Sequence, residues 1–201
     1  MPSAKKVEFF FDFGSPTAYL AYTQLPKIAR ECGAELVWRP MLLGGVFKAT
    51  GNQSPVMIEP KGRWMFEDMQ RWAQRYGVTL VKNPFFIINT LTLMRGAAGM
   101  QMREPARFEK YVEVVYRAMW QEPVNLGDPL IVATTLKAAG FDPIAFAEMA
   151  ADPVVKQKLI DSTDEAVKRG AFGAPTMFVG DAMFFGQDRL DFVREALFAI
   201  R

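Results

Sequence analysis

Hydrophobic and polar positions divide the chain into strand-like ends and a long helical middle. Residues 7–13 (VEFFFDF) are rich in aromatic, strand-forming side chains, and this pattern predicts a buried strand. Ser15 followed by Pro16 is typical of a helix start, with serine as the N-cap. Apolar residues at helical spacing then predict a helix that stops at Gly33, and residues 35–39 (ELVWR) predict a second strand. The chain therefore opens with a predicted parallel βαβ unit.

The middle of the chain carries apolar residues at helical spacing. This spacing predicts helices over residues 64–76, 89–102 and 106–120. Three Asp-Pro pairs follow, and each opens a further apolar-periodic run: Asp128-Pro129, Asp142-Pro143 and Asp152-Pro153. An aspartate N-cap with proline in the first turn is the expected start of a helix. The region is thus predicted to be almost entirely helical.

Strand pattern returns near the end of the chain. TMFV (residues 176–179) and AMFF (182–185) flank Gly180-Asp181, a connection typical of a tight hairpin, and a closing helix follows. The order βαβ, helices, ββα predicts an α/β protein, a thioredoxin-like fold interrupted by an all-α insertion. We expect residues 1–46 and 161–201 to form the thioredoxin-like domain and residues 47–160 to form the inserted helical domain.

Composition removes several classes of function. The 24 Lys and Arg nearly balance the 22 Asp and Glu, no basic tract occurs, and nucleic acid is not expected as a partner. No run reaches the roughly 18 apolar residues of a membrane span, and no signal peptide is recognised, which indicates a cytoplasmic protein. The absence of histidine removes Ser-His pairs and histidine metal sites, and no metal is expected. The single cysteine, Cys32, excludes an internal disulfide and a C-x-x-C pair.

The turn from Phe13 to Pro16 is the first candidate for chemistry. It follows the carboxyl end of a strand and precedes a helix N-terminus, where unpaired N–H groups favour an anion. Ser15 either caps its helix only or also donates a hydrogen bond to a bound anion. Without a histidine base, Ser15 is unsuited to be a deprotonated nucleophile.

Two further segments carry weaker signals. Pro175, directly before a strand, is either a turn proline or a cis proline. Asp188, in Gly186-Gln187-Asp188, is most simply a helix cap. Lys48, Asn52 and Lys61 lie in a stretch rich in glycine and proline, and they are predicted to be solvated loop residues.

Taken together and in order, several segments resemble one family. These are FDFGSPTAYLA, LLGGVFKATGNQSP, EPKGRW, NTLTLMRG, GAFGAPTMFV and FGQDRL. They are similar to 2-hydroxychromene-2-carboxylate isomerases and kappa-class glutathione transferases, which have a thioredoxin fold with a helical insertion and are related to bacterial disulfide oxidases. The resemblance covers nearly the whole chain. It implies glutathione as cofactor, a small aromatic molecule as substrate, and a homodimer.

The resemblance also implies roles for particular residues. Ser15 would hydrogen-bond the glutathione sulfur, and Ala174, before a cis Pro175, would pair its backbone with the cysteinyl part. The γ-glutamyl end would be held by residues 185–188, with the Asp188 carboxylate facing its ammonium group. This assigns cofactor binding to Ser15, Asn52, Lys61, Ala174, Pro175, Phe185, Gly186, Gln187 and Asp188. It assigns substrate binding to Lys48, Asn52 and Asn89, with Lys48 meeting the substrate carboxylate.

The implied reaction interconverts 2-hydroxychromene-2-carboxylate and trans-o-hydroxybenzylidenepyruvate by reversible thiolate addition. Two departures from the family pattern stand out: Ile87 occupies a position where proline is frequent, and Thr17 stands where the transferases tend to have tyrosine. The second favours an isomerase over the main alternative, a kappa-like transferase. A non-catalytic thioredoxin-fold binding or chaperone module is a third interpretation, and a disulfide oxidoreductase is the weakest because the cysteine pair is missing.

Overall fold

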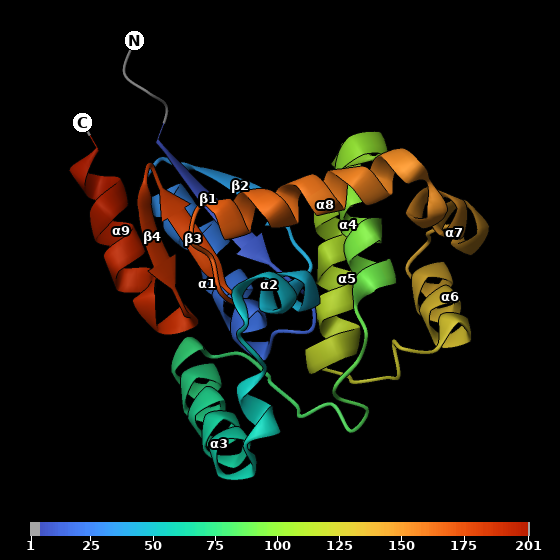
Figure 1. The fold of residues 1–201 in the computed structure, drawn as a ribbon, viewed down its shortest axis with the longest axis horizontal. Helices are drawn as coiled ribbons and strands as arrows, with labels where there is room; N and C mark the ends of the chain where they lie inside the picture. Colours follow the sequence, from blue (N-terminus) through green and yellow to red (C-terminus); the bar gives the residue numbers. More distant parts are fainter. Residues whose placement is uncertain (1–4, 201) are drawn as a thin grey trace.

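A four-stranded mixed sheet forms the centre of the molecule (Figure 1). A computed structural model describes residues 5–200. The strands lie in the order β2-β1-β3-β4, and their bounds are β1 Lys6–Phe11, β2 Glu35–Pro40, β3 Thr176–Val179 and β4 Ala182–Phe185. β1 pairs with β2 in parallel, whereas β3 is antiparallel to both β1 and β4. The predicted parallel unit and the hairpin at Gly180-Asp181 are both confirmed.

Alternation along β1 gives the sheet two apolar faces. Phe9 and Phe11 point to one side, where they stack on each other. There the Phe9 ring lies tilted to Trp38 of β2, and the Phe11 ring meets Trp38 edge to face. Phe10 points to the other side, where it meets Phe178 of β3 edge to face. All three phenylalanines of β1 are completely buried. A strand that is apolar on both faces needs cover on both sides, and the helices supply it.

Helices pack on both faces of the sheet. α1 (Pro16–Glu31) and α9 (Leu190–Ala199) contact each other and the strands. α8 (Pro153–Lys168) contacts β2 and is the long orange helix that crosses the sheet in Figure 1. The remaining helices are α2 Leu43–Thr50, α3 Glu59–Tyr76, α4 Leu91–Arg103, α5 Phe108–Trp120, α6 Pro129–Ala138 and α7 Pro143–Ala151. Short 3-10 turns cover Pro55–Met57, Pro105–Arg107 and Gln187–Arg189.

The Asp-Pro prediction for the helical middle is confirmed. Asp128, Asp142 and Asp152 are the N-caps of α6, α7 and α8, and each side chain accepts a hydrogen bond from the backbone N–H two residues later. Each proline stands in the first helical turn, where its missing N–H costs nothing. The three helices therefore begin where the local sequence dictates.

The prediction that Lys48 and Lys61 are solvated is confirmed, but the prediction that they lie in a loop was wrong. Lys48 lies on α2, and Lys61 lies in the first turn of α3, which begins five residues before the predicted start; Asn52 alone of the three stays in a loop. Gly44 and Gly45 weaken the helical signal of α2 in the sequence. Tertiary packing overrides that weakness, because Val46 is completely buried and α2 packs against α8.

The predicted division into two domains remains a prediction. Its second boundary, between residues 160 and 161, falls inside α8. This helix packs at once against α4 and α7 and against α2 and β2. α8 thus joins the helical region to the sheet as a continuous element.

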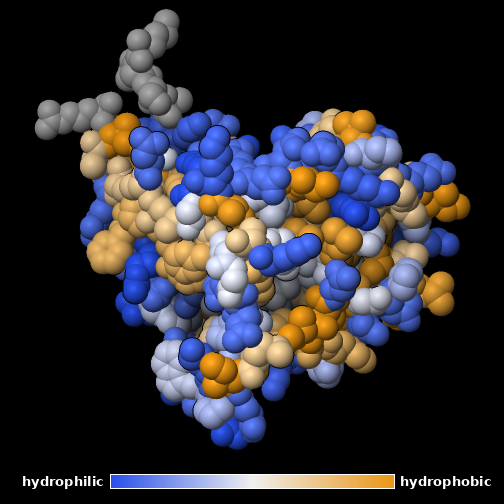
Figure 2. Space-filling model, viewed as in Figure 1, coloured by the Kyte–Doolittle hydropathy of each residue, from blue (hydrophilic) through white to orange (hydrophobic). Residues whose placement is uncertain are grey.

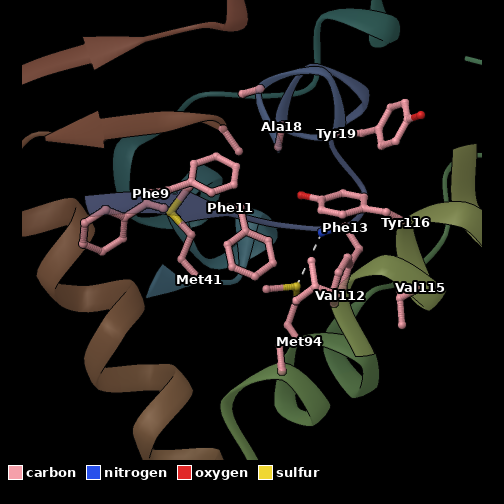
Figure 3. Close-up of a cluster of buried hydrophobic side chains, with 14 of the residues drawn as sticks. Phe9, Phe11, Phe13, Ala18, Tyr19, Met41, Met94, Val112, Val115 and Tyr116 are labelled. Carbon is pink, nitrogen blue, oxygen red and sulfur yellow. Dashed lines mark hydrogen bonds between the residues drawn. The ribbon is translucent and has the colours of Figure 1, made fainter. Parts of the chain in front are cut away.

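A buried aromatic cluster fixes the end of β1 (Figure 3). The Phe13 ring packs edge to face on Tyr116 of α5, with ring centroids 4.9 Å apart. The Phe13 N–H points at the Met94 sulfur of α4 at 3.4 Å, and the Trp120 indole N–H donates to the Phe13 carbonyl at 2.8 Å. The turn that follows Phe13 is therefore held by α4 and α5. Within the described residues, no helix has the length and apolar character needed to cross a membrane.

Candidate active site

Ser15 begins α1 in the way its sequence predicts. Its backbone is extended (φ −97°, ψ 111°), and its Oγ accepts a hydrogen bond from the Ala18 N–H at 3.1 Å. Pro16 occupies the first helical turn. The side chain is almost fully buried, yet it lines a cleft. Ser15 is therefore a helix cap whose hydroxyl also borders a binding space.

The Ser15 hydroxyl takes part in a second set of contacts. It donates to the Ala174 carbonyl at 3.0 Å and lies 2.9 Å from the Thr17 Oγ1. Thr17 also donates to the Ala174 carbonyl at 3.0 Å. Sequence reasoning noted Thr17 only as a departure from the family pattern. Its place two residues after a helix N-cap, in the first turn, was the available signal.

The segment before β3 brings Ala174 to the Ser15 turn. The Ala174-Pro175 peptide bond is cis, as expected. The Thr176 Oγ1 donates to the Gly173 carbonyl at 2.8 Å, and the Pro175 carbonyl accepts from the Gly186 N–H at 3.1 Å. A second cis bond precedes Ile87, at the position where the sequence departs from the family pattern.

A cleft of about 660 Å³ opens in front of this turn. Of the predicted site residues, its walls include Ser15, Asn52, Lys61, Ala174, Phe185, Gly186, Gln187 and Asp188. Much of the remaining wall is apolar and comes from Leu43, Phe47, Trp64, Met65, Phe66, Met69, Phe86 and Phe172. Around α2 and α3, hydrophobic surface lies next to hydrophilic surface in Figure 2. The walls of the cleft thus combine polar groups with aromatic and aliphatic side chains.

Three predicted residues do not line the cleft. Pro175 is buried in the turn behind Ala174. Lys48 is exposed on α2, and Asn89 is exposed before α4, where its Oδ1 accepts from the Leu91 N–H at 3.0 Å. Lys48 and Asn89 are therefore not brought to the Ser15 turn in this structure.

Four charged side chains line the cleft. Asp188 lines it together with Arg189, whose Nη1 lies 2.7 Å from the Asp188 Oδ2. Lys61 and Asp68 add one charge of each sign. Arg189 was missed in the sequence, although it directly follows a predicted site residue. A zwitterionic group would find opposite charges for both of its ends here.

Hydrogen bonds hold the walls of the cleft in place. The Asn52 side-chain amide donates to the Phe172 carbonyl at 2.8 Å, which links the loop after α2 to the segment before β3. The Tyr76 hydroxyl donates to the Gln187 carbonyl at 2.7 Å and joins the end of α3 to the Asp188 segment. Burial raises the pKa of Tyr76 to about 12, so this phenol stays a donor at physiological pH.

Asp12 is a buried carboxylate behind the turn that the sequence reasoning overlooked. Its Oδ1 accepts from the Gly14 N–H at 2.8 Å and from the Thr90 hydroxyl at 2.7 Å, and its Oδ2 accepts from the Leu43 N–H at 2.8 Å. Burial raises the pKa of Asp12 above its usual range, and these three hydrogen bonds oppose the rise. The available signal was an acidic residue within an otherwise apolar run.

Three comparisons with known proteins show what this chain is similar to. Residues 6–198 match the family model described as a DSBA-like thioredoxin domain. The 2-hydroxychromene-2-carboxylate isomerase of Sphingobium xenophagum is 33% identical over 96% of this chain and 98% of its own. Kappa 1 glutathione S-transferase of Rattus norvegicus is 27% identical over 94% of this chain and 89% of its own. A solved structure of a 2-hydroxychromene-2-carboxylate isomerase is 32% identical, covers 96% of this chain and 94% of its own, and has a TM-score of 0.84.

Proposed function

The chain belongs to the family of DSBA-like thioredoxin domains, with 2-hydroxychromene-2-carboxylate isomerases among its relatives, and from this we propose that it is a glutathione-dependent isomerase. The proposed reaction converts 2-hydroxychromene-2-carboxylate, or a close aromatic analogue, to the trans-o-hydroxybenzylidenepyruvate form. One observation carries the proposal. The Ser15 hydroxyl stands at the N-terminus of α1, at the edge of a cleft whose walls hold both charged and apolar side chains.

The donors at this turn fit an anionic sulfur. A helix N-terminus favours negative charge, and a serine hydroxyl can donate to it. The chain has no histidine, so the obvious base for a serine nucleophile is missing. Serine as a hydrogen-bond donor to a thiolate suits this residue set better than serine as an attacking group.

The charged groups fit the two ends of the tripeptide. Glutathione carries one ammonium and two carboxylate groups. Asp188 would hold the ammonium group, and Arg189 and Lys61 would hold the carboxylates, since all three residues line the cleft. Asn52 is fixed by its bond to the Phe172 carbonyl and would present its remaining polar atoms to the cofactor.

When bound, glutathione supplies a thiolate that can add to a conjugated carbon and leave again, and the former double bond is free to rotate in between. The role of the chain is to keep that sulfur ionised near neutral pH. A hydrogen bond to a charged group contributes about 1.5–3 kcal/mol, and a helix end adds about 0.3–1 kcal/mol. At about 1.36 kcal/mol per pKa unit, Ser15 and α1 would lower the thiol pKa by roughly one to three units.

The apolar walls support a flat aromatic substrate. Phe47, Phe66 and Phe86 line the cleft together with Met65 and Met69. Aromatic rings pack well on such surfaces, and the sulfur of methionine adapts to their edges. These residues would also limit water around the reacting carbon.

A turnover experiment separates the isomerase from its main alternative. With glutathione at a small fraction of the substrate concentration, we expect 2-hydroxychromene-2-carboxylate to reach equilibrium with its open form, followed by absorbance, while free glutathione stays constant. Ser15→Ala should lower the rate about 10- to 100-fold, in line with the loss of one hydrogen bond to a charged group. Stoichiometric loss of glutathione with a halogenated aromatic acceptor would instead indicate a transferase. Lack of turnover together with lack of glutathione binding would favour a non-catalytic binding module.

The proposal includes a homodimer, as the family resemblance implies. Light scattering should then give a particle mass of twice the 22.6 kDa of the chain. A mass of 22.6 kDa at micromolar concentration would indicate a monomer.

A further inference from the structure

Three polar atoms at the head of the cleft share two protons. The Ser15 Oγ, the Thr17 Oγ1 and the Ala174 carbonyl oxygen form a triangle with sides of 2.9, 3.0 and 3.0 Å. Each hydroxyl carries one hydrogen and the carbonyl carries none. At any moment, at most two of the three contacts are hydrogen bonds. The Ala18 N–H adds nothing to this count, because it donates to the Ser15 oxygen from the other side.

This shortage of protons limits what Ser15 can do for a ligand. To donate to a bound anion, Ser15 must turn its hydrogen away from the triangle. Ala174 is 8% exposed, and a buried carbonyl that loses its donors is destabilised. Among the described residues, Ser15 and Thr17 are the two side chains that donate to this carbonyl. Ser15 can therefore give up its hydrogen bond to the Ala174 carbonyl when the Thr17 hydroxyl continues to donate to that carbonyl.

We propose that Thr17 is a positioning residue that keeps the Ala174 carbonyl hydrogen-bonded and so releases the Ser15 hydroxyl for the sulfur of the bound cofactor. The inference rests on the proposed function. Thr17 lines the same cleft as Ser15 and lies in the same helical turn, so no backbone movement is needed for the exchange. Before binding, the Ser15 and Thr17 side chains share the Ala174 carbonyl; afterwards Thr17 is the side chain that continues to donate to it.

The experiment measures the pKa of glutathione bound to the parent protein, Ser15→Ala, Thr17→Val, Thr17→Ser and the double variant Ser15→Ala/Thr17→Val. The readout is the ultraviolet absorbance of the thiolate against pH, with affinity from calorimetry. Valine closely matches threonine in shape and lacks the hydroxyl, whereas serine keeps it. The charged groups near the turn, Lys61, Asp68, Asp188, Arg189 and the buried Asp12, are the same in every variant.

The proposal predicts a specific order of results. The parent lowers the thiol pKa below its solution value, and Ser15→Ala returns it toward about 8.5. Thr17→Val raises the pKa of the bound thiol by about one unit above its value in the parent. At a pH where most of the bound thiol is still protonated, this means about tenfold less thiolate, or about 1.4 kcal/mol. Thr17→Ser keeps the parental pKa. The double variant equals Ser15→Ala alone, because Thr17 acts through Ser15.

Several outcomes would overturn the inference, and one of them would remove the proposed function as well. If the parent neither binds glutathione nor lowers its thiol pKa, both fall together. If the parent and Thr17→Val lower the thiol pKa equally, only the proposed role of Thr17 is overturned. It falls too if Thr17→Ser is as impaired as valine, or if Ser15→Ala keeps the parental pKa, since Thr17 would then be the direct donor. Circular dichroism checks folding, and Thr17→Ala replaces valine if that variant does not fold.

Discussion

At the scale of single residues, Asp12 connects the starts of three helices. Its carboxylate binds the Gly14 N–H before α1, the Leu43 N–H at the first residue of α2, and the hydroxyl of Thr90, the N-cap of α4. Helix N-termini favour negative charge, which offsets part of the cost of burying it. Asp12 thereby fixes the position of the Ser15 turn without lining the cleft.

Asp12→Asn should destabilise the protein by about 1–3 kcal/mol, because the amide NH₂ group would face a backbone N–H or a hydroxyl donor. The difference should depend on pH. Since burial raises the pKa of Asp12 in the folded state, its contribution is fully present below the unfolded pKa of about 3.9 and is lost as pH rises through the folded pKa. In urea unfolding, the difference in free energy of unfolding between the parent and Asp12→Asn should therefore become smaller from pH 4 to pH 7.

Asp181→Asn in the exposed hairpin turn is the matched control and should leave the free energy of unfolding unchanged. A constant difference between the parent and Asp12→Asn across this range would contradict a raised pKa for Asp12.

Residues that act through distant partners were the ones that sequence reasoning could not assign. Local signals combined with the family resemblance predicted that Ser15 and Asp188 share one site and that the bond before Pro175 is cis. Asp12 and Thr17 acquire their roles from Leu43, Thr90 and Ala174, which are far away in the chain. Their side chains are common types at positions without a local pattern. Only the folded arrangement identifies what they bind.

At the scale of elements, α2 shows why one helix was missed when the others were found. Its N-cap, Leu42, has no capping side chain; the first N–H of the helix binds Asp12 from another segment. Gly45 allows a close approach to α8, because a Cβ there would lie 3.2 Å from the Thr163 Cγ2. The caps of α6, α7 and α8 are local in sequence and were predicted; the cap of α2 is tertiary and was not.

Glycines within the helices give a matched pair of tests. A Cβ on Gly96 of α4 would lie 2.8 Å from the Phe146 Cζ of α7 and would also press on the Tyr111 hydroxyl. Gly96→Ala should therefore cost about 1–3 kcal/mol through overpacking, despite its better helix propensity. Gly44→Ala on α2 meets no atom within 4 Å and should be neutral or stabilising by up to about 1 kcal/mol.

Thermal and urea unfolding of both variants measure this difference. Equal stability of Gly96→Ala and the parent would mean that α4 and α7 can separate, and that their close contact is not needed for folding.

At the scale of the whole molecule, an ion-pair network joins the helical region to the sheet. Glu8 of β1 pairs with Arg169, just after α8, at 2.9 Å and with Arg39 of β2 at 3.3 Å. Glu165 of α8 pairs with Arg39 as well. The Arg169 guanidinium also lies 3.8 Å from the centre of the Phe178 ring. The predicted domain boundary inside α8 therefore lies close to a strongly connected part of the fold.

A double-mutant cycle with Glu8→Ala and Arg169→Ala should give a coupling of about 0.5–3 kcal/mol. Glu8 and Arg169 are only 12% and 26% exposed, so solvent screens this pair less than a surface pair. Arg169→Ala should cost more than Glu8→Ala, since it also removes the contact with Phe178. Glu59 and Arg63, an exposed pair on α3, serve as the control, with an expected coupling of at most about 0.5 kcal/mol. Equal couplings for both pairs would argue against a joining role for α8.

The sheet order has a consequence for how the protein is made on the ribosome. β1 and β2 are close together in the chain, but the other edge of β1 pairs with β3, and 159 residues separate Ser15 from Ala174. At roughly 5–20 residues per second, that stretch takes about 10 to 30 seconds to translate. Throughout this time the phenylalanine-rich edge of β1 is open to pairing with other nascent chains. If the proposed cofactor contacts at Ala174 and Asp188 are right, the cofactor cannot assist early folding, because both residues are translated after the helical region. A holdase chaperone is therefore most useful to this protein before β3 leaves the ribosome.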